Sequence, residues 1–222
     1  ASLELTAEEA DTVQQRVRDA GIAFMAEFPC RLAPATLRLK ELIATRLGQP
    51  SLLFCNQRLA LTRSDAKPQS ANVRQLIEMV DWCRYVIDCE PTSVVGTAYA
   101  SQGDGGGQDY LVMALDFSAQ ANVGNGPMAQ IACGCYVPNR WSEAAYFRRP
   151  AELQVICEKG IAFIDLPDKL TWFDDAGQHN ESLDRDRPVG EQLLMHFHRS
   201  VSSLVLKTSS LEDAYRALSI VL

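Results

Sequence analysis

The chain has 222 residues, 47% of them hydrophobic, and a formal net charge of −7 from 21 basic and 28 acidic side chains. This length suffices for one domain with a sizeable core, or for one domain and a fragment. The acidic balance, without a run of Lys or Arg, argues against nucleic acid and anionic membranes as partners. No stretch of about eighteen apolar residues and no charged-then-apolar leader is evident, so we expect a cytoplasmic protein.

The seven cysteines predict no disulfide framework and no metal centre. They are odd in number and lie among apolar residues, without the C-x-x-C pairs of zinc or redox sites. We expect buried free thiols in a reducing compartment. His196 and His198 are two residues apart on an expected helix and cannot share a metal ion there, so we assign no metal site.

The first part of the chain predicts a helix, a strand, a second helix and a second strand. Thr6 with the following glutamates is typical of a helix start, and Gly21 is typical of its end. The continuously apolar stretch Ile22–Ala26 predicts a short strand buried on both faces. A helix from Pro34 to Leu47 and a strand from Ser51 to Leu61 follow.

A longer helix, Ser70–Cys89, is the segment around which we expect the fold to be organised. Its apolar residues recur at spacings of three and four, which gives one buried stripe. Arg74, Glu78 and Asp81 form a second line at i, i+4 and i+7. That line is either a solvated face, worth about 0.2–0.5 kcal/mol per charge pair, or part of a site.

The rest of the chain predicts an antiparallel sheet and two closing helices. The expected strands are Thr92–Ala100, Tyr110–Phe117, Ala129–Val137, Glu152–Glu158, Gly160–Leu166 and Lys169–Asp174, and the expected helices are Val189–Leu204 and Ser210–Leu222. The fold class is therefore α+β: an open, mostly antiparallel β-sheet with helices packed on one face. We expect Val112, Ala114, Ile131 and Cys133 to be among the apolar residues of its free face, available to a second copy.

Two further motifs are candidate binding sites. The glycine run Gly103–Gly107 lacks the G-x-G-x-x-G spacing and lies between two strands, which favours a hairpin tip over a phosphate loop. Arg31 follows the expected strand of the first unit, and ligand crevices lie at such strand ends in open α/β sheets. Arg31 is therefore the best single basic candidate for a ligand contact.

Several stretches carry a family resemblance. They are Leu3–Thr6 with Glu9 and Ala10, then Arg31, Pro34, Lys40 and Ile43, then Gly48–Pro50, and finally the strand pair Leu153–Ile164 and the helix start Ser210–Ala214. In this order they resemble the glucose-fructose oxidoreductase/inositol dehydrogenase (Gfo/Idh/MocA) family. The resemblance covers nearly the whole chain.

The resemblance implies a two-domain oxidoreductase that transfers hydride between NAD or NADP and a sugar, polyol or related carbonyl compound. Residues 1–28 would then be the remnant of the end of a Rossmann dinucleotide-binding domain. Residues 29–222 would be the substrate-binding and oligomerisation domain, which forms a dimer or larger homo-oligomer through its sheet face. The cofactor would belong to the full-length protein, and we expect this chain alone to bind none and to be inactive.

The resemblance also places a D-x-x-x-H motif on the long helix, where Arg74 and Glu78 replace the Asp and the His and Asp81 follows. It implies Glu78 and Asp81 as catalytic residues and Arg31, Arg74 and Arg84 as substrate-binding residues. An acid–base group must reach the reacting atom and change its protonation near neutral pH, which Glu78 does only if burial raises its pKa. Two alternatives stay open: a non-catalytic oligomerisation or ligand-binding module of the same fold, and an unrelated α+β binding domain.

Overall fold

The computed structural model describes residues 7–22, 24–58, 68–99, 110–119, 125–134, 143, 151–202 and 209–222. The helical elements are α1 (Ala7–Ala20), the 3-10 turn η1 (Pro29–Leu32), α2 (Pro34–Leu42), its π-helical continuation η2 (Ile43–Leu47), α3 (Pro68–Ile87), α4 (Val189–Ser202) and α5 (Ser209–Val221). The strands are β1 (Pro50–Arg58), β2 (Ser93–Tyr99), β3 (Tyr110–Asp116), β4 (Met128–Gly134), β5 (Leu153–Cys157), β6 (Gly160–Asp165), β7 (Lys169–Asp174) and β8 (Gly177–Ser182).

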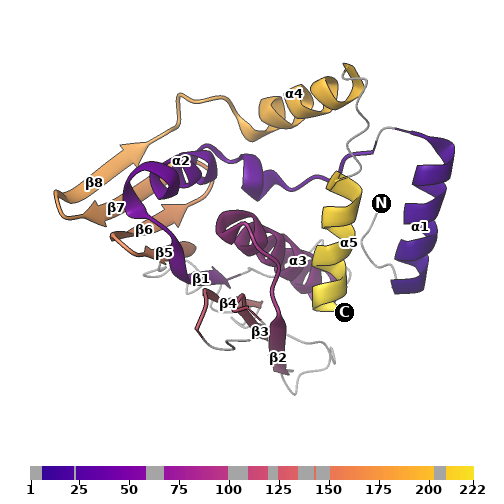
Figure 1. Cartoon of the computed structure of the whole chain (residues 1–222), viewed down its shortest axis with the longest axis horizontal. Helices are drawn as coiled ribbons and strands as arrows, with labels where there is room; N and C mark the ends of the chain where they lie inside the picture. The colour runs from indigo at the N-terminus through magenta and orange to yellow at the C-terminus, as the bar shows by residue number, and fades with distance from the viewer. Residues whose placement is uncertain are drawn as a thin grey trace.

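The described strands form one sheet in the order β2-β3-β4-β1-β5-β6-β7-β8 (Figure 1). β1 lies inside this sheet, parallel to β4 and antiparallel to β5. All other neighbouring strands are antiparallel. A parallel pair requires a crossover connection, and α3 lies in the connection between β1 and β4. The long helix is therefore held across the sheet by the topology as well as by its apolar stripe.

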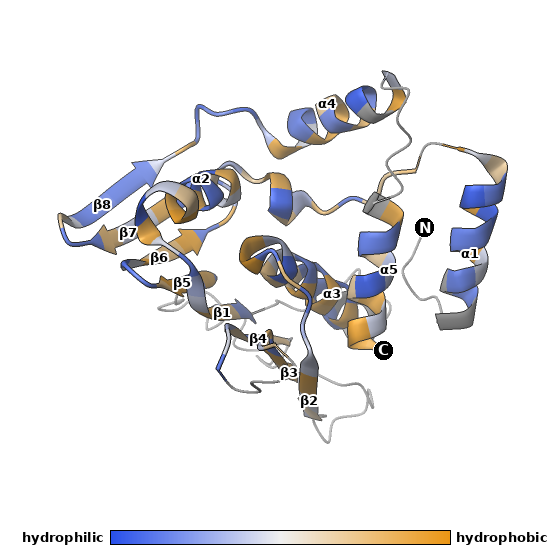
Figure 2. Cartoon of the chain, viewed as in Figure 1, coloured by the Kyte–Doolittle hydropathy of each residue, from blue (hydrophilic) through white to orange (hydrophobic). Residues whose placement is uncertain are grey.

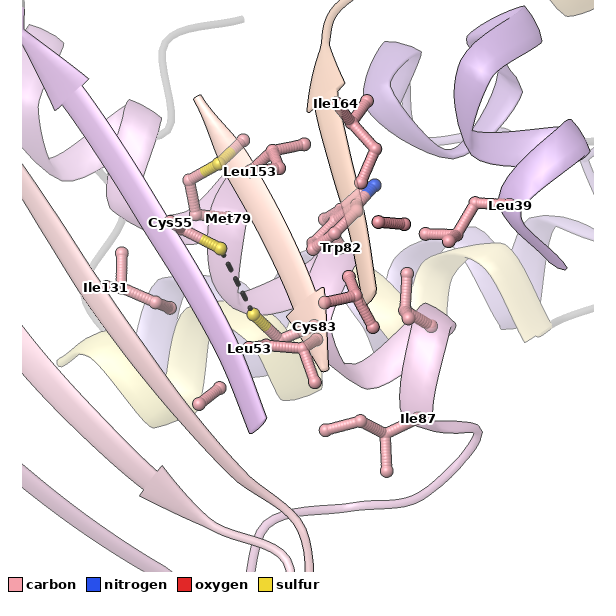
Figure 3. Packing of buried hydrophobic residues seen from close by; sticks show 14 of the residues in the cluster. Leu39, Leu53, Cys55, Met79, Trp82, Cys83, Ile87, Ile131, Leu153 and Ile164 are labelled. Atoms are coloured by element: carbon pink, nitrogen blue, oxygen red, sulfur yellow. Dashed lines mark hydrogen bonds between the residues drawn. The ribbon is translucent and has the colours of Figure 1, made fainter. Parts of the chain in front are cut away.

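Helices α2 and α3 cover one face of the sheet. Side chains alternate along β3, where Leu111, Met113 and Leu115 are buried and their neighbours are partly exposed. α3 packs on β4, β1 and β3, whereas α2 packs on β6 and β7. Figure 3 shows this core from close by, with Trp82 and Cys83 of α3 directed toward residues of the strands. The Sγ atoms of Cys55 on β1 and Cys83 on α3 are 3.6 Å apart in its centre.

The long helix has the boundaries that its sequence predicts to within two residues. Pro68 occupies the first helical position, where a missing N–H costs nothing. The helix ends at Ile87, and Asp88 then adopts a positive φ of 63°. Pro91 follows shortly afterwards and cannot continue the helix.

The remaining helices lie beside this layer. α5 packs along α3, and α1 packs on α5. α4 packs on η1, and it carries Leu194, Phe197 and Val201, which are 72%, 40% and 57% exposed. No helix in the described ranges is long and apolar enough to cross a membrane.

Most of the expected elements are confirmed, but three expectations need correction. The strand Ile22–Ala26 is wrong, because residues 22 and 24–26 have no regular secondary structure and no described strand pairs with them. A strand needs a neighbour that takes its backbone hydrogen bonds. Strand β8 was not expected at all, since its sequence Gly177–Ser182 contains no apolar residue. The expected strands of this region are joined by hairpins at Glu158–Gly160 and Leu166–Lys169.

The third correction concerns the free face of the sheet. Val112 and Ala114 lie on that face and are partly exposed. Ile131 and Cys133 do not, because both are completely buried on the helix side. The thiols of Cys30, Cys55, Cys83, Cys89, Cys133 and Cys157 are free as expected, although Cys89 is exposed rather than buried. The expected hairpin tip Gly103–Gly107 lies outside the described residues.

Candidate functional site

The polar line on α3 passes from solvent into the core. Arg74 is exposed and makes no ion pair with another described residue, so the solvated interpretation is right for Arg74. Glu78 is partly buried, one turn further along. Asp81 is 1% exposed, so the solvated interpretation is wrong for Asp81. A buried carboxylate requires partners that satisfy its charge.

Asp81 is bound by two arginines. Arg31 of η1 donates two hydrogen bonds to its carboxylate, one from Nε to Oδ2 at 2.6 Å and one from Nη2 to Oδ1. Arg84, one turn further along α3, donates from Nη1 to Oδ1 at 3.4 Å. The fork-shaped guanidinium of Arg31 matches the planar carboxylate, which is the strong bidentate geometry.

The same arginines tie the C-terminal helix to α3. Arg31 Nη1 donates to Asp213 Oδ2 of α5 at 3.1 Å, and Arg84 Nη1 donates to the Asp213 carbonyl at 3.1 Å. Arg84 also holds Glu90 through two bonds of 2.7 and 2.6 Å. Arg84 is 3% exposed, so these partners satisfy its buried charge. The result is a continuous ion-pair network that joins η1, α3 and α5.

The electrostatics of this network follow from its burial. Burial raises the pKa of the Asp81 carboxyl to about 6, against the opposing effect of the Arg31 hydrogen bonds. At neutral pH the carboxylate is therefore still ionised and paired. The hydrogen bonds from Arg84 hold the pKa of Glu90 below its usual value. Asp81 therefore titrates just below neutral pH, whereas Glu90 stays ionised there.

A second group of polar side chains includes Glu78. The thiol of Cys30 donates to Glu78 Oε1 at 3.1 Å. Burial and the charge of Glu78 both raise the pKa of Cys30, so this cysteine is a neutral donor and not a thiolate nucleophile. Gln57, at the end of β1, donates to Glu152 at 3.5 Å, and the charge of Glu152 also raises the pKa of Cys30. Glu78 is thus the acceptor in a cluster formed by η1, α3 and the strand ends.

The sequence-predicted site residues therefore divide into three sets. Arg31, Asp81 and Arg84 are brought together, but they satisfy one another. Glu78 is a turn away from Asp81 and is bound by Cys30. Arg74 stands apart from both sets. Cys30 was missed as a site residue, and its position directly before Arg31 was the one signal for it. Gln57 and Glu152 carried no signal, because their proximity arises from the pairing of β1 with β5.

A third cluster lies on the half of the sheet covered by α2. Arg38 donates two hydrogen bonds to Glu181 of β8, at 2.8 and 3.0 Å, and the Trp172 indole donates to the same carboxylate at 3.2 Å. His179 stacks on Trp172 with ring centroids 3.8 Å apart. These contacts fix the polar strand β8 to the layer of α2. Among the described residues, no group of three His, Cys, Asp or Glu side chains is arranged to hold a metal ion.

Several solved structures have the same architecture as this chain. UDP-N-acetylglucosamine 3-dehydrogenase GnnA from Acidithiobacillus ferrooxidans superposes with a TM-score of 0.76 at 17% identity, over 99% of this chain and 66% of that one. The chain has the fold of a Gfo/Idh/MocA oxidoreductase. Aldose-aldose oxidoreductase from Caulobacter crescentus, complexed with glycerol, gives a TM-score of 0.75 at 14% identity, over 97% of this chain and 64% of that one.

A third structure carries a cofactor. It is an oxidoreductase from Agrobacterium radiobacter in complex with NAD+, L-tartaric acid and magnesium, with a TM-score of 0.71 at 14% identity, over 97% of this chain and 66% of that one. The chain thus spans about two thirds of the length of these Gfo/Idh/MocA-type structures. No family model and no curated protein sequence matches it. The resemblance drawn from the sequence is confirmed for the fold.

Proposed function

We propose that this chain is the substrate-binding and oligomerisation part of an NAD(P)-dependent oxidoreductase of the cytoplasm that acts on a sugar, polyol or related carbonyl compound. The observation that carries the proposal is the match of 97–99% of the chain to oxidoreductases of one fold. Two of them are named for sugar substrates, and a third was solved with NAD+. The free thiols fit a reducing compartment.

We propose the division at residue 28 on the same grounds. Residues 1–28 would complete a Rossmann domain, and residues 29–222 would form the substrate domain. The apolar side chains of Val13, Ile22 and Phe24 are 37%, 55% and 38% exposed, which suits a surface covered by a further domain. A nicotinamide cofactor bound by that domain would supply or accept the hydride. We assign no cofactor-binding residue to this chain.

In this proposal Glu78 is the group that exchanges a proton with the substrate. It is partly buried, and the Cys30 thiol orients its carboxylate from one side. Of the three arginines expected to bind substrate, Arg74 is the one with no described ion-pair partner, and we assign it to direct substrate contact. Arg31, Asp81 and Arg84 would act indirectly: their mutual bonds fix η1 against α3 and so hold Cys30 beside Glu78.

The free face of the sheet is the proposed homo-oligomer surface. Side chains on this face are partly exposed and largely apolar, because no described helix packs on them. They include Leu52, Phe54, Val112, Ala114, Met128, Ile156, Ile161, Phe163 and Phe173. A flat apolar patch of this kind is typical of an interface between identical subunits.

A specific observation favours a second candidate function, a non-catalytic module of the same fold. Three of the five site residues expected from the sequence bind one another in a buried ion-pair network, so their charges are already paired. If Glu78 serves only to satisfy Cys30, the protein binds a ligand or assembles without turnover.

The deciding experiment uses the natural gene product with NADH and NADPH and a panel of sugars, polyols and bilin-type substrates. Turnover is expected, and Glu78→Gln should lower kcat by a factor of about 10²–10⁴, as for loss of a general acid–base group. Glu191→Gln, at an exposed position on α4, is the matched control. Absence of turnover with every substrate, together with retained assembly, would instead establish the non-catalytic module.

A further inference from the structure

At one edge of the sheet no described strand pairs with the terminal strand. Among the described strands β2 is terminal and pairs only with β3, through seven consecutive residue pairs from Ser93 with Asp116 to Tyr99 with Tyr110. No bulge interrupts this register. Half of the backbone N–H and C=O groups of a terminal strand point away from its neighbour, so β2 presents a regular row of hydrogen-bonding groups to the outside.

The side chains of β2 are exposed on both faces of the sheet. All seven residues are exposed, and Val94, Val95 and Tyr99 are 38%, 69% and 60% exposed. Val94 lies on the side of the helices, in register with the buried Leu115. Val95 and Tyr99 lie on the free side. In Figure 1 β2 projects beyond α3.

The sequence of β2 has none of the features that protect terminal strands. Proteins discourage edge pairing with charged side chains, prolines and bulges. Ser93–Tyr99 contains no Lys, Arg, Asp, Glu or Pro. The opposite terminal strand, β8, differs: its residues are all polar, and Glu181 and His179 are engaged by Arg38 and Trp172. Figure 2 shows the contrast as an apolar β2 and a hydrophilic β8.

We propose that β2 is a second assembly surface, at which two copies of the chain pair their β2 strands antiparallel around a two-fold axis and so continue the sheet from one subunit into the other. An antiparallel pair of identical strands is self-complementary, because every N–H···O=C bond from residue i of one copy to residue j of the other is repeated, by the two-fold axis, from residue i of the second copy to residue j of the first. The inference does not depend on the oxidoreductase assignment.

Charge favours a second copy as the occupant. The chain carries a net charge of −7, so two copies repel each other over most orientations. β2 lacks acidic and basic side chains, and pairing there brings no like charges of the strand together. With the overlap centred on Gly96, Val94 would lie opposite Ala98 of the partner. A Cβ at Gly96 would meet only ordinary contacts, the Val112 carbonyl oxygen at 3.7 Å and Met113 Cε at 4.0 Å, so the centre of the strand is open.

The test is sedimentation velocity of the natural gene product and two variants over a range of concentrations. Val94→Lys places a charge on the edge strand, on the side opposite the free face, and should halve the mass of the assembly. Leu52→Lys is the companion variant for the other proposed surface, since Leu52 is 40% exposed on the free face and remote from β2. Leu52→Lys should leave the β2 contact, and the double variant should sediment as a monomer.

Amide hydrogen exchange provides a second readout that needs no variant. Backbone amides of β2 should exchange more slowly at high than at low protein concentration, while those of β8 should not change. A wild-type monomer at all concentrations would overturn the proposal. So would a well-folded Val94→Lys variant with the mass of the wild type, or exchange at β2 that does not depend on concentration.

Discussion

The guanidinium of Arg31 donates two hydrogen bonds to the carboxylate of Asp81, which lies 50 residues later in the sequence. Arg31 is 20% exposed and Asp81 is 1% exposed, so the pair spans the boundary between the surface and the core. Arg31 also lies over the rings of Phe28 and Tyr85, with its Cζ 5.1 and 5.3 Å from their centroids. Because Arg31 precedes α2 and Asp81 is inside α3, this one contact fixes the two helix-bearing segments relative to each other.

Removal of Arg31 should destabilise the protein in a pH-dependent way. Arg31→Met leaves a buried carboxylate with less compensation, which costs about 3–5 kcal/mol at pH 8. The folded pKa of Asp81, about 6, already lies above the value of about 3.9 for an unfolded chain. The folded state therefore binds this proton more tightly, and the Asp81 contribution to stability falls as pH rises. Loss of Arg31 raises that pKa further, so the destabilisation should be smaller at pH 5 than at pH 8.

Urea unfolding followed by circular dichroism at both pH values measures this effect. Arg74→Met is the control on the helix that carries Asp81, because Arg74 is exposed and makes no ion pair with any described residue. Its free energy of unfolding should stay within about 0.5 kcal/mol of the wild type. Equal destabilisation of Arg31→Met at pH 5 and pH 8 would contradict the assignment of the cost to ionised Asp81.

The Arg38–Glu181 pair should give the opposite pH dependence. Hydrogen bonds from Arg38 hold the pKa of Glu181 below its usual value, so its contribution is present above about pH 4.3 and is lost as pH falls. Both side chains are partly exposed, so Glu181→Gln should cost only about 1 kcal/mol at pH 7. The difference from the wild type should shrink below about pH 4, as measured by thermal unfolding. A difference that does not change with pH would assign the effect to packing.

Gly160 should not accept a side chain. A Cβ there would lie 2.2 Å from the Phe173 carbonyl oxygen and 2.6 Å from Leu47 Cδ2. Gly160→Ala must displace a neighbouring strand and should cost about 1–3 kcal/mol. Gly190→Ala on α4 is the control: its Cβ would meet nothing within 4 Å, and alanine stabilises a helix by about 0.5–1 kcal/mol relative to glycine. Chemical denaturation should therefore shift in opposite directions for the two variants.

A fully buried hydrogen bond between side chains joins α2 to α3. The Trp82 indole N–H donates to the Thr36 hydroxyl at 3.0 Å, and both residues are fully buried. Thr36→Val keeps the volume but leaves the N–H without an acceptor, which should cost about 1–3 kcal/mol. Thr45→Val removes an exposed hydroxyl bond to the Glu41 carbonyl and serves as the control. Similar stability of the two variants, compared by urea unfolding, would show that the indole finds another acceptor.

The sequence predicted the elements that depend on local pattern. α3 was predicted to within two residues because its apolar stripe, its proline start and its stop are all local signals. β8 was missed because its stability derives from pairing with β7 and from Arg38, and neither is visible in six polar residues. The strand expected at Ile22–Ala26 failed for the converse reason, since an apolar pattern forms no strand without a neighbour.

The sequence predicted which residues of α3 belong to the candidate site, but not how deeply they are buried or what binds them. Spacing placed Glu78 and Asp81 on one side of a helix, but it gave no depth, and Asp81 turned out to be buried. Arg31, which binds Asp81, lies 50 residues before it in the sequence, and Cys30, which binds Glu78, lies 48 residues before it. Both partners belong to η1. Which residues become partners over such separations depends on how the segments pack. Only the structure therefore identifies Cys30 as part of the site.

The place of β1 in the sheet has a consequence for how the protein acquires its shape. Leu53 pairs with Ala129 on one side and with Val155 on the other, so neither strand beside β1 is close to it in the sequence. At ribosomal rates of about 5–20 residues per second, β1 waits on the order of ten seconds for its second partner. Contacts of such long range also slow refolding. We expect the apolar residues of β1 to be the main target of chaperones during synthesis.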